Sequence, residues 1–130
     1  MKLAVTGARI LLGLIFVVFG LNYFLGFLGQ PELNEELGGF IGALAGTGYM
    51  MPLIKITEIV AGLMIMSGRM TPLGLILLAP VSVNILLAHI FLDAAGLPMA
   101  LVIIALQLFL AWAYRDSFDG VLHARAEPLI

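Results

Sequence analysis

Long apolar runs alternate with short polar segments along this chain, and each run is long enough to cross a membrane. An α-helix needs about 20 predominantly apolar residues to span the hydrocarbon core of a bilayer. The runs fall at about residues 8–28, 51–67, 73–92 and 98–114. This pattern predicts an all-α membrane protein, a bundle of four transmembrane helices that cross up, down, up and down.

The segment between the first two runs has a different pattern, that of a short amphipathic helix. Apolar residues recur there at the spacing of one helix face: Leu33, Leu37, Phe40, Ile41 and Leu44. Acidic residues gather near its start, where the helix dipole favours negative charge: Glu32, Glu35 and Glu36. The segment is too short and too acidic to span, so we expect it to lie in the interface or to fold back as a cap over the bundle.

Three glycines form a small-residue face on the same segment. Gly38, Gly42 and Gly46 are four residues apart, a spacing that lets two helices approach closely. We expect this face to pack within the subunit, and a dimerisation face is the alternative interpretation.

The composition places the chain among integral membrane proteins. Of its 130 residues, 62% are hydrophobic and 11% are charged, with a mean hydropathy of +1.16. Four spans leave no room for a separate soluble domain, so we expect one transmembrane domain over residues 1–115. Residues 116–130 are expected to form a short, poorly ordered cytoplasmic tail.

The absence of cysteine excludes disulfides, dithiol redox chemistry and thiolate metal sites. The net charge of −2 argues against a nucleic-acid partner.

Charged residues outside the spans are divided between the two sides of the membrane. One side carries basic residues: Lys2, Arg9, Arg69, Arg115 and Arg125. The other side carries acidic residues and no Lys or Arg: Glu32, Glu35, Glu36 and Asp93. The positive-inside rule therefore predicts a protein of the bacterial inner (cytoplasmic) membrane with both termini in the cytoplasm.

The second span contains two charged residues, Lys55 and Glu58, three positions apart on one helix face. An ionisable side chain at membrane depth costs at least about 2.5–3.5 kcal/mol, so we expect the two to pair and to face protein or water. A functional site is the default interpretation of such a pair. The alternative is a structural ion pair that fixes helix packing.

The other polar residues of the spans fall at similar depths. Helix rise places Lys55 and His89 about 6 Å and Asn22 about 8–9 Å from the outer ends of their spans, and Glu58, Asn84 and Gln107 about 12–14 Å. This distribution predicts a polar pocket that opens to the outside, with Asp93 at its edge. Hydrogen bonding between helices is the alternative role for Asn22, Asn84 and Gln107.

His89 is the candidate for proton handling, because histidine exchanges protons near neutral pH. Asp93, four residues later, is its expected carboxylate partner on the same face. No second histidine lies in any span, so the sequence predicts no metal site.

Two stretches resemble the DoxX family of small four-helix membrane proteins: ARILLGLIFVVFGLNYF in the first span and KITEIVAGLMIMSGRMTPLGLILLAPVSVNILLAHIFLD in the next two. The most specific pieces are the EIxxGLxxxxGR stretch that begins at Glu58 and the polar positions from Asn84 to Asp93. Some members of that family belong to a membrane thiosulfate:quinone oxidoreductase or to redox-linked membrane complexes. More distant relatives resemble eukaryotic cargo receptors and receptor-assembly chaperones. The resemblance implies that Lys55, Glu58, Asn84 and His89 bind quinone or another amphipathic ligand.

Three functions follow from these features. The leading hypothesis is a redox-associated subunit whose pocket binds quinone. Its rival is a non-enzymatic membrane protein in which the same pocket holds a lipid or a partner helix. A small proton-coupled exporter ranks last, because exporters of this size carry their essential carboxylate in the first span and Glu58 lies in the second. Whether the chain catalyses a reaction, and whether it forms a homo-oligomer or joins partner membrane subunits, stays open at the level of sequence.

Overall fold

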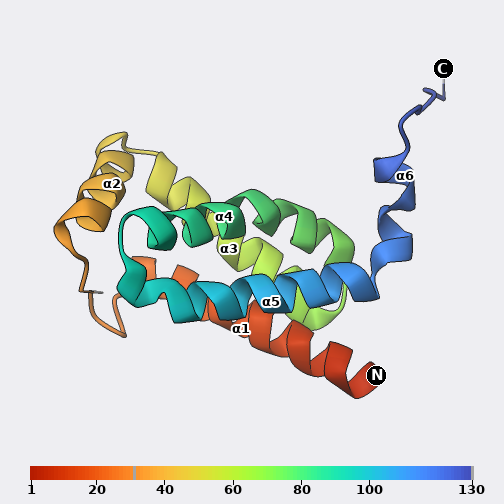
Figure 1. Cartoon of the computed structure of the whole chain (residues 1–130), viewed down its shortest axis with the longest axis horizontal. Helices are drawn as coiled ribbons and strands as arrows, with labels where there is room; N and C mark the ends of the chain where they lie inside the picture. The colour runs from red at the N-terminus through yellow and green to blue at the C-terminus, as the bar shows by residue number, and fades with distance from the viewer. Residues whose placement is uncertain (31, 130) are drawn as a thin grey trace.

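A computed structural model describes residues 1–30 and 32–129, and these residues fold entirely into helices and connecting turns (Figure 1). The helices in chain order are α1 (Lys2–Leu25), α2 (Glu35–Gly46), α3 (Met50–Ser67), α4 (Thr71–Phe91), η1 (Ala94–Gly96), α5 (Leu97–Ala113), η2 (Arg115–Phe118) and α6 (Asp119–Leu122).

The four long helices α1, α3, α4 and α5 form an antiparallel bundle. Each packs against two neighbours, in the order α1, α3, α4, α5 and back to α1. The N-terminus, the α3–α4 turn and the end of α5 lie together at one end of the bundle (Figure 1). The short helix α2 and the turn between α4 and α5 lie at the other end, which we call the α2 end. The arrangement confirms the predicted four-helix bundle.

Within the described residues, four helical segments are long and apolar enough to cross a membrane: Lys2–Leu25, Met50–Ser67, Thr71–Phe91 and Ala94–Ala113. Their outward faces expose large apolar side chains, among them Phe19 (45%), Leu63 (48%) and Leu108 (65%). Such a surface is stable against lipid tails and unfavourable in water.

The first helix begins and ends earlier than the sequence pattern predicted. It starts at Lys2 and ends at Leu25, where Gly26 takes a left-handed conformation with φ of 70°. Glycine adopts this conformation without steric cost and commonly ends helices. Gly68 ends α3 in the same way, with φ of 78°. The predicted tail is also partly regular, since η2 and α6 make its first part helical.

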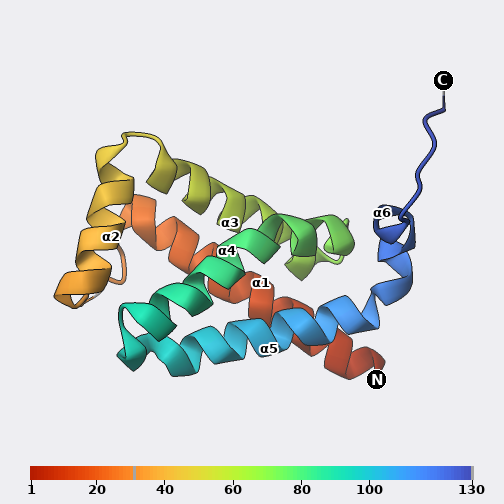
Figure 2. The ribbon, with the colours of Figure 1, turned by 45° about the horizontal axis from the view of Figure 1, so that its top comes forward.

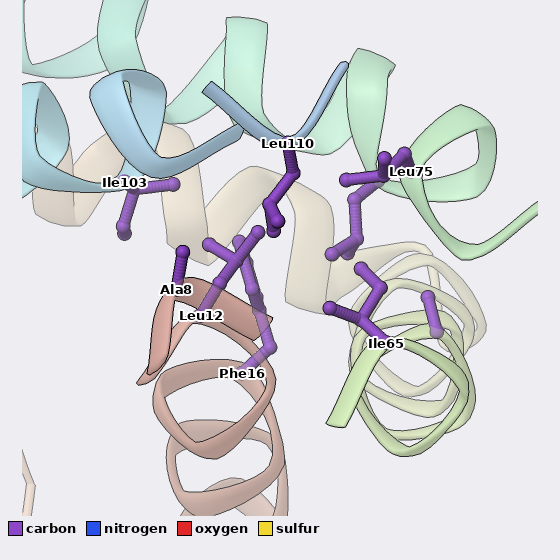
Figure 3. Close-up of a cluster of buried hydrophobic side chains, with 9 residues drawn as sticks. Ala8, Leu12, Phe16, Ile65, Leu75, Ile103 and Leu110 are labelled. Atoms are coloured by element: carbon purple, nitrogen blue, oxygen red, sulfur yellow. The ribbon is translucent and has the colours of Figure 1, made fainter. Parts of the chain in front are cut away.

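The bundle core lies where all four long helices meet (Figure 3). Each helix contributes one fully buried leucine or isoleucine to it: Leu12, Ile65, Leu78 and Leu110. Lipid is as apolar as these side chains, so their close packing, rather than exclusion from water, holds the helices together.

Glycines set how closely the helices approach. A β-carbon at Gly13 of α1 would lie 2.6 Å from the Gly62 carbonyl oxygen of α3, so the two backbones touch there. Gly74 plays the same part between α4 and α3, where a β-carbon would lie 3.0 Å from the Ala61 carbonyl oxygen. Small residues at such contacts let membrane helices approach closely.

The predicted packing of Gly38, Gly42 and Gly46 within the subunit is wrong. A β-carbon at Gly42 or Gly46 would meet no described atom within 4 Å, and one at Gly38 would meet only Leu33 of its own segment. The reason is the orientation of α2, whose opposite, apolar face is the one turned toward the bundle.

Candidate functional site

A large cavity lies between α2, α3 and α4, at the α2 end of the bundle. Its volume is about 700 Å³. The helices α3 and α4 are close near their connecting turn, at Gly74, and diverge toward α2 (Figure 2). The cavity occupies the space that this divergence leaves, and α2 covers one side of it.

The apolar stripe that was predicted for α2 and for the residues just before it faces this cavity. All five of its members line the wall: Leu33, Leu37, Phe40, Ile41 and Leu44. Apolar residues of the other two helices, including Met51, Ile54 and Ile85, line the remaining apolar surface. This arrangement matches one of the two predicted placements of the segment, a cap that folds back over the bundle.

Asn34 holds the start of α2 in place and was not recognised in the sequence. Its side-chain oxygen accepts a hydrogen bond of 2.8 Å from the Leu37 backbone N–H and caps α2. Its side-chain amide donates a bond of 2.7 Å to the Leu92 carbonyl oxygen at the end of α4. An asparagine directly before Glu35 and Glu36 is a helix-start signal. Nothing in the sequence points to its contact with α4.

Lys55 and Glu58 form the predicted ion pair on the α3 wall of the cavity. The Lys55 Nζ and Glu58 Oε2 atoms are 3.1 Å apart. The Glu58 side chain is 5% exposed and that of Lys55 is 21% exposed. Glu58 Oε2 has no hydrogen-bond partner of suitable geometry among the described residues, although Lys55 balances its charge. This oxygen is itself buried, and Glu58 contributes to the wall of the cavity.

His89 faces these residues from α4, and its partner differs from the one predicted. The His89 Nδ1 atom lies 3.0 Å from the Asp93 backbone carbonyl oxygen. The Asp93 carboxylate instead accepts a bond of 3.1 Å from the Ala95 N–H, because it caps η1. A carbonyl oxygen only accepts, so Nδ1 carries the proton in this bond and Nε2 of the neutral ring is an acceptor.

Asn84 also lines the cavity from α4. Its side-chain amide donates a hydrogen bond of 2.9 Å to the Pro80 carbonyl oxygen of the preceding turn. The bond orients the side chain, and its Oδ1 atom accepts no hydrogen bond from the described residues.

Two residues of the predicted pocket, Asn22 and Gln107, do not line it. Because α1 ends at Leu25, Asn22 lies in its last turn, where its side-chain oxygen accepts a bond of 2.7 Å from the Leu28 N–H. Its amide donates a bond of 3.2 Å to the Gly29 carbonyl oxygen. Asn22 therefore orders the turn after the helix.

Gln107 of α5 packs against α4, where it forms hydrogen bonds to one residue before Pro80 and one after it. Its amide donates a bond of 3.1 Å to the Leu75 carbonyl oxygen, and its oxygen accepts a bond from the Ser82 hydroxyl. It lines a separate, smaller groove of about 340 Å³ between α4, α5 and α6. This is the hydrogen bonding between helices that the sequence offered as its alternative role.

No group of three or more His, Cys, Asp or Glu side chains suited to a metal ion occurs among residues 1–30 and 32–129. The cavity thus combines an apolar wall with a few polar groups, namely an ion pair, a histidine, an amide and the acidic residues Glu32 and Asp93 at its edge.

The fold defines a multi-pass membrane protein, with a cavity between α2 and the helices of its second and third candidate spans. Residues 4–90 match the DoxX family model, and the chain belongs to the DoxX family. It is 30% identical over 128 residues to the uncharacterized protein YwoB of Bacillus subtilis (strain 168), an alignment that covers 93% of this chain and 82% of the relative. No solved structure matches the chain.

Proposed function

We propose that the chain binds an amphipathic ligand in the cavity between α2, α3 and α4 and serves as a redox-associated membrane subunit, with quinone as the leading ligand. The observation that carries this proposal is the pairing of a broad apolar wall with the polar side chains of Lys55, Glu58 and His89. Small-molecule sites typically have volumes of about 300–1,000 Å³ and a few convergent polar groups in an apolar lining. The cavity, at about 700 Å³, falls in this range.

The two parts of an amphipathic ligand fit the two sides of the cavity. An apolar tail packs against the α2 stripe, and a polar head lies between α3 and α4, beside Lys55, Glu58, Asn84 and His89. Lys55 retains N–H groups beyond the one directed at Glu58 and can donate to a carbonyl oxygen of the head. The chain has no cysteine, so the proposal assigns it no thiol chemistry.

The second candidate function is non-enzymatic binding of a lipid or partner, or assistance in assembly. It is favoured by the predominance of apolar side chains in the wall, since such a wall suits any acyl or prenyl chain. The same cavity serves both functions, and the identity of its natural occupant separates them.

The orientation that we propose places the α2 end on the outer side of the bacterial cytoplasmic membrane and both termini in the cytoplasm. Its support is the charge distribution: Lys2, Arg69 and Arg115 belong to the end opposite α2. The cavity then opens in the outer leaflet.

Mass spectrometry of lipids and cofactors that co-purify with the protein tests the proposal. Ala88 lines the cavity, and Ala88→Phe fills part of it. Ala79 is on the same helix and lines the separate groove, so Ala79→Phe is the matched control. We expect a quinone or other amphipathic molecule in the wild type and in Ala79→Phe, and its loss in Ala88→Phe. If the wild type retains nothing beyond what Ala88→Phe retains, the binding proposal is wrong.

A further inference from the structure

The hydrogen-bonding groups of the cavity are unequally divided between acceptors and donors. Glu58, as the partner of an ammonium, is a carboxylate with about four lone-pair positions. Lys55 is its ion-pair partner, and its Oε2 atom is buried without a hydrogen bond of suitable geometry. A buried acceptor that gives up water without finding a donor is costly, and a hydrogen bond to a charged group is among the stronger ones. Glu58 lines the cavity, so its carboxyl group gives the α3 side of the wall an acceptor.

His89 adds a second acceptor that faces the same space. Its Nδ1–H is used by the Asp93 carbonyl oxygen, which leaves Nε2 of the neutral ring with a free lone pair. Gly96 packs against the ring, because a β-carbon at residue 96 would overlap it. The lone pair is therefore fixed in direction by the surrounding backbone.

Asn84 supplies a third acceptor on the α4 wall of the cavity. One of its amide N–H groups is used by the Pro80 carbonyl oxygen, and its Oδ1 atom accepts no hydrogen bond from the described residues. The free donors are the remaining N–H groups of Lys55 and the second N–H of Asn84. A ligand atom that only accepts satisfies Lys55 and leaves Glu58 and His89 unsatisfied.

We infer that the cavity selects a neutral ligand with a free hydroxyl group on its head, and this inference rests on the proposed function. A hydroxyl donates its O–H to Glu58 or His89 and accepts from Lys55 with the same oxygen. A carbonyl, ether or ester oxygen at that position accepts from Lys55 but has no hydrogen to donate to Glu58 or His89.

An anionic head group fits less well. The charged side chains that line the cavity comprise three carboxylates, Glu32, Glu58 and Asp93, and one ammonium, Lys55. A phosphate placed among them meets more repulsion than attraction. Neutral membrane lipids that carry such a hydroxyl include the hydroquinone form of a quinone and a diacylglycerol.

Two matched pairs of probes test the inference on the full-length protein in detergent, by native mass spectrometry titration. The first pair is a decyl-substituted benzohydroquinone and its quinone. The second pair is dioctanoylglycerol and the same molecule with its hydroxyl acetylated. Within each pair the hydroxyl is the main difference. We expect the hydroxyl member of at least one pair to bind about tenfold more tightly, the size of one charge-assisted hydrogen bond. The pair that shows the preference identifies the source of the natural ligand.

A substitution in the cavity wall tests whether the preference for the hydroxyl probe arises in the cavity. His89→Leu removes one acceptor, so we expect the hydroxyl member to lose affinity and its partner to change little. Thr57 lies on α3 outside the cavity lining, and Thr57→Val is the control that keeps the preference.

The outcomes separate the inference from the function on which it rests. If the probes bind and the hydroxyl members show no advantage in either pair, the inference is wrong and the binding function stands. If no probe of either pair binds, both are wrong. An advantage that persists unchanged in His89→Leu, in Asn84→Leu and in Glu58→Gln also overturns the inference, because its acceptors would then lie elsewhere.

Discussion

The imidazole ring of His89 occupies the space that a β-carbon on Gly96 would need, so these two residues fix one another across the turn between α4 and α5. The backbone of Gly96 has φ of −87°, which any residue adopts. The requirement for glycine is therefore steric, and it exists because the ring must reach the Asp93 carbonyl oxygen.

This relationship predicts a coupling between residues 89 and 96. Gly96→Ala displaces the ring and breaks its hydrogen bond to Asp93, with an expected loss of about 0.5–1.5 kcal/mol in the free energy of unfolding. The same substitution in a His89→Ala background is expected to be neutral, because no ring remains to be displaced. Unfolding of all four proteins in mixed micelles measures the coupling. Equal losses in both backgrounds contradict it.

The Lys55–Glu58 pair predicts a second coupling. Removing one partner of a buried pair leaves the other charge without compensation, at a cost of about 3–5 kcal/mol when both are fully buried. Lys55 is 21% exposed, so we expect a smaller loss for Glu58→Gln than for Lys55→Met. The double variant is expected to be more stable than the Lys55→Met protein. Detergent unfolding measures this, and single variants as stable as the wild type would mean that both groups are hydrated.

Helix packing predicts opposite effects for two glycine substitutions. Gly62→Ala places a β-carbon 2.9 Å from the Gly13 carbonyl oxygen, and neither backbone yields easily. We expect it to destabilise the bundle by about 1–3 kcal/mol. Gly42→Ala on α2 meets no described atom within 4 Å and replaces a poor helix former, so a gain of up to about 1 kcal/mol is expected. Thermal unfolding compares them, and equal effects would contradict the packing of α1 on α3.

Gln107 predicts a loss of stability without a loss of binding. Gln107→Leu removes its bonds to Leu75 and Ser82, and interhelical hydrogen bonds in membranes contribute about 0.6 kcal/mol on average. The side chain does not line the cavity, so ligand affinity is expected to be unchanged. A ligand titration of this variant beside Asn84→Leu tests this. Weaker binding in Gln107→Leu would contradict the prediction that Gln107 has no part in ligand binding.

The proposed orientation predicts which engineered cysteines react from outside. The chain has no cysteine of its own, so single substitutions give an unambiguous signal. A membrane-impermeant maleimide is expected to label Asp93→Cys in intact cells and Arg69→Cys only after the membrane is opened. Labelling of Arg69→Cys in intact cells would reverse the orientation.

The sequence by itself determined the features that depend on neighbours along the chain. Run length and composition predicted four spans, and the spacing of Leu33, Leu37 and Phe40 predicted the apolar face of α2. The Lys55–Glu58 pair was also predictable, because residues three apart on a helix are adjacent whatever the rest of the chain does.

Only the tertiary structure decided which residues face the cavity. Depth along a span predicts the height of a side chain and says nothing of its direction around the bundle, which is why Gln107 was grouped with Asn84 although the two lie in different spaces. The early end of α1 left Asn22 to order the turn after the helix, and the backbone rather than the side chain of Asp93 became the partner of His89. These outcomes depend on the rotation of each helix and on close contacts such as that at Gly74. Both are set by packing between segments that are distant in the sequence.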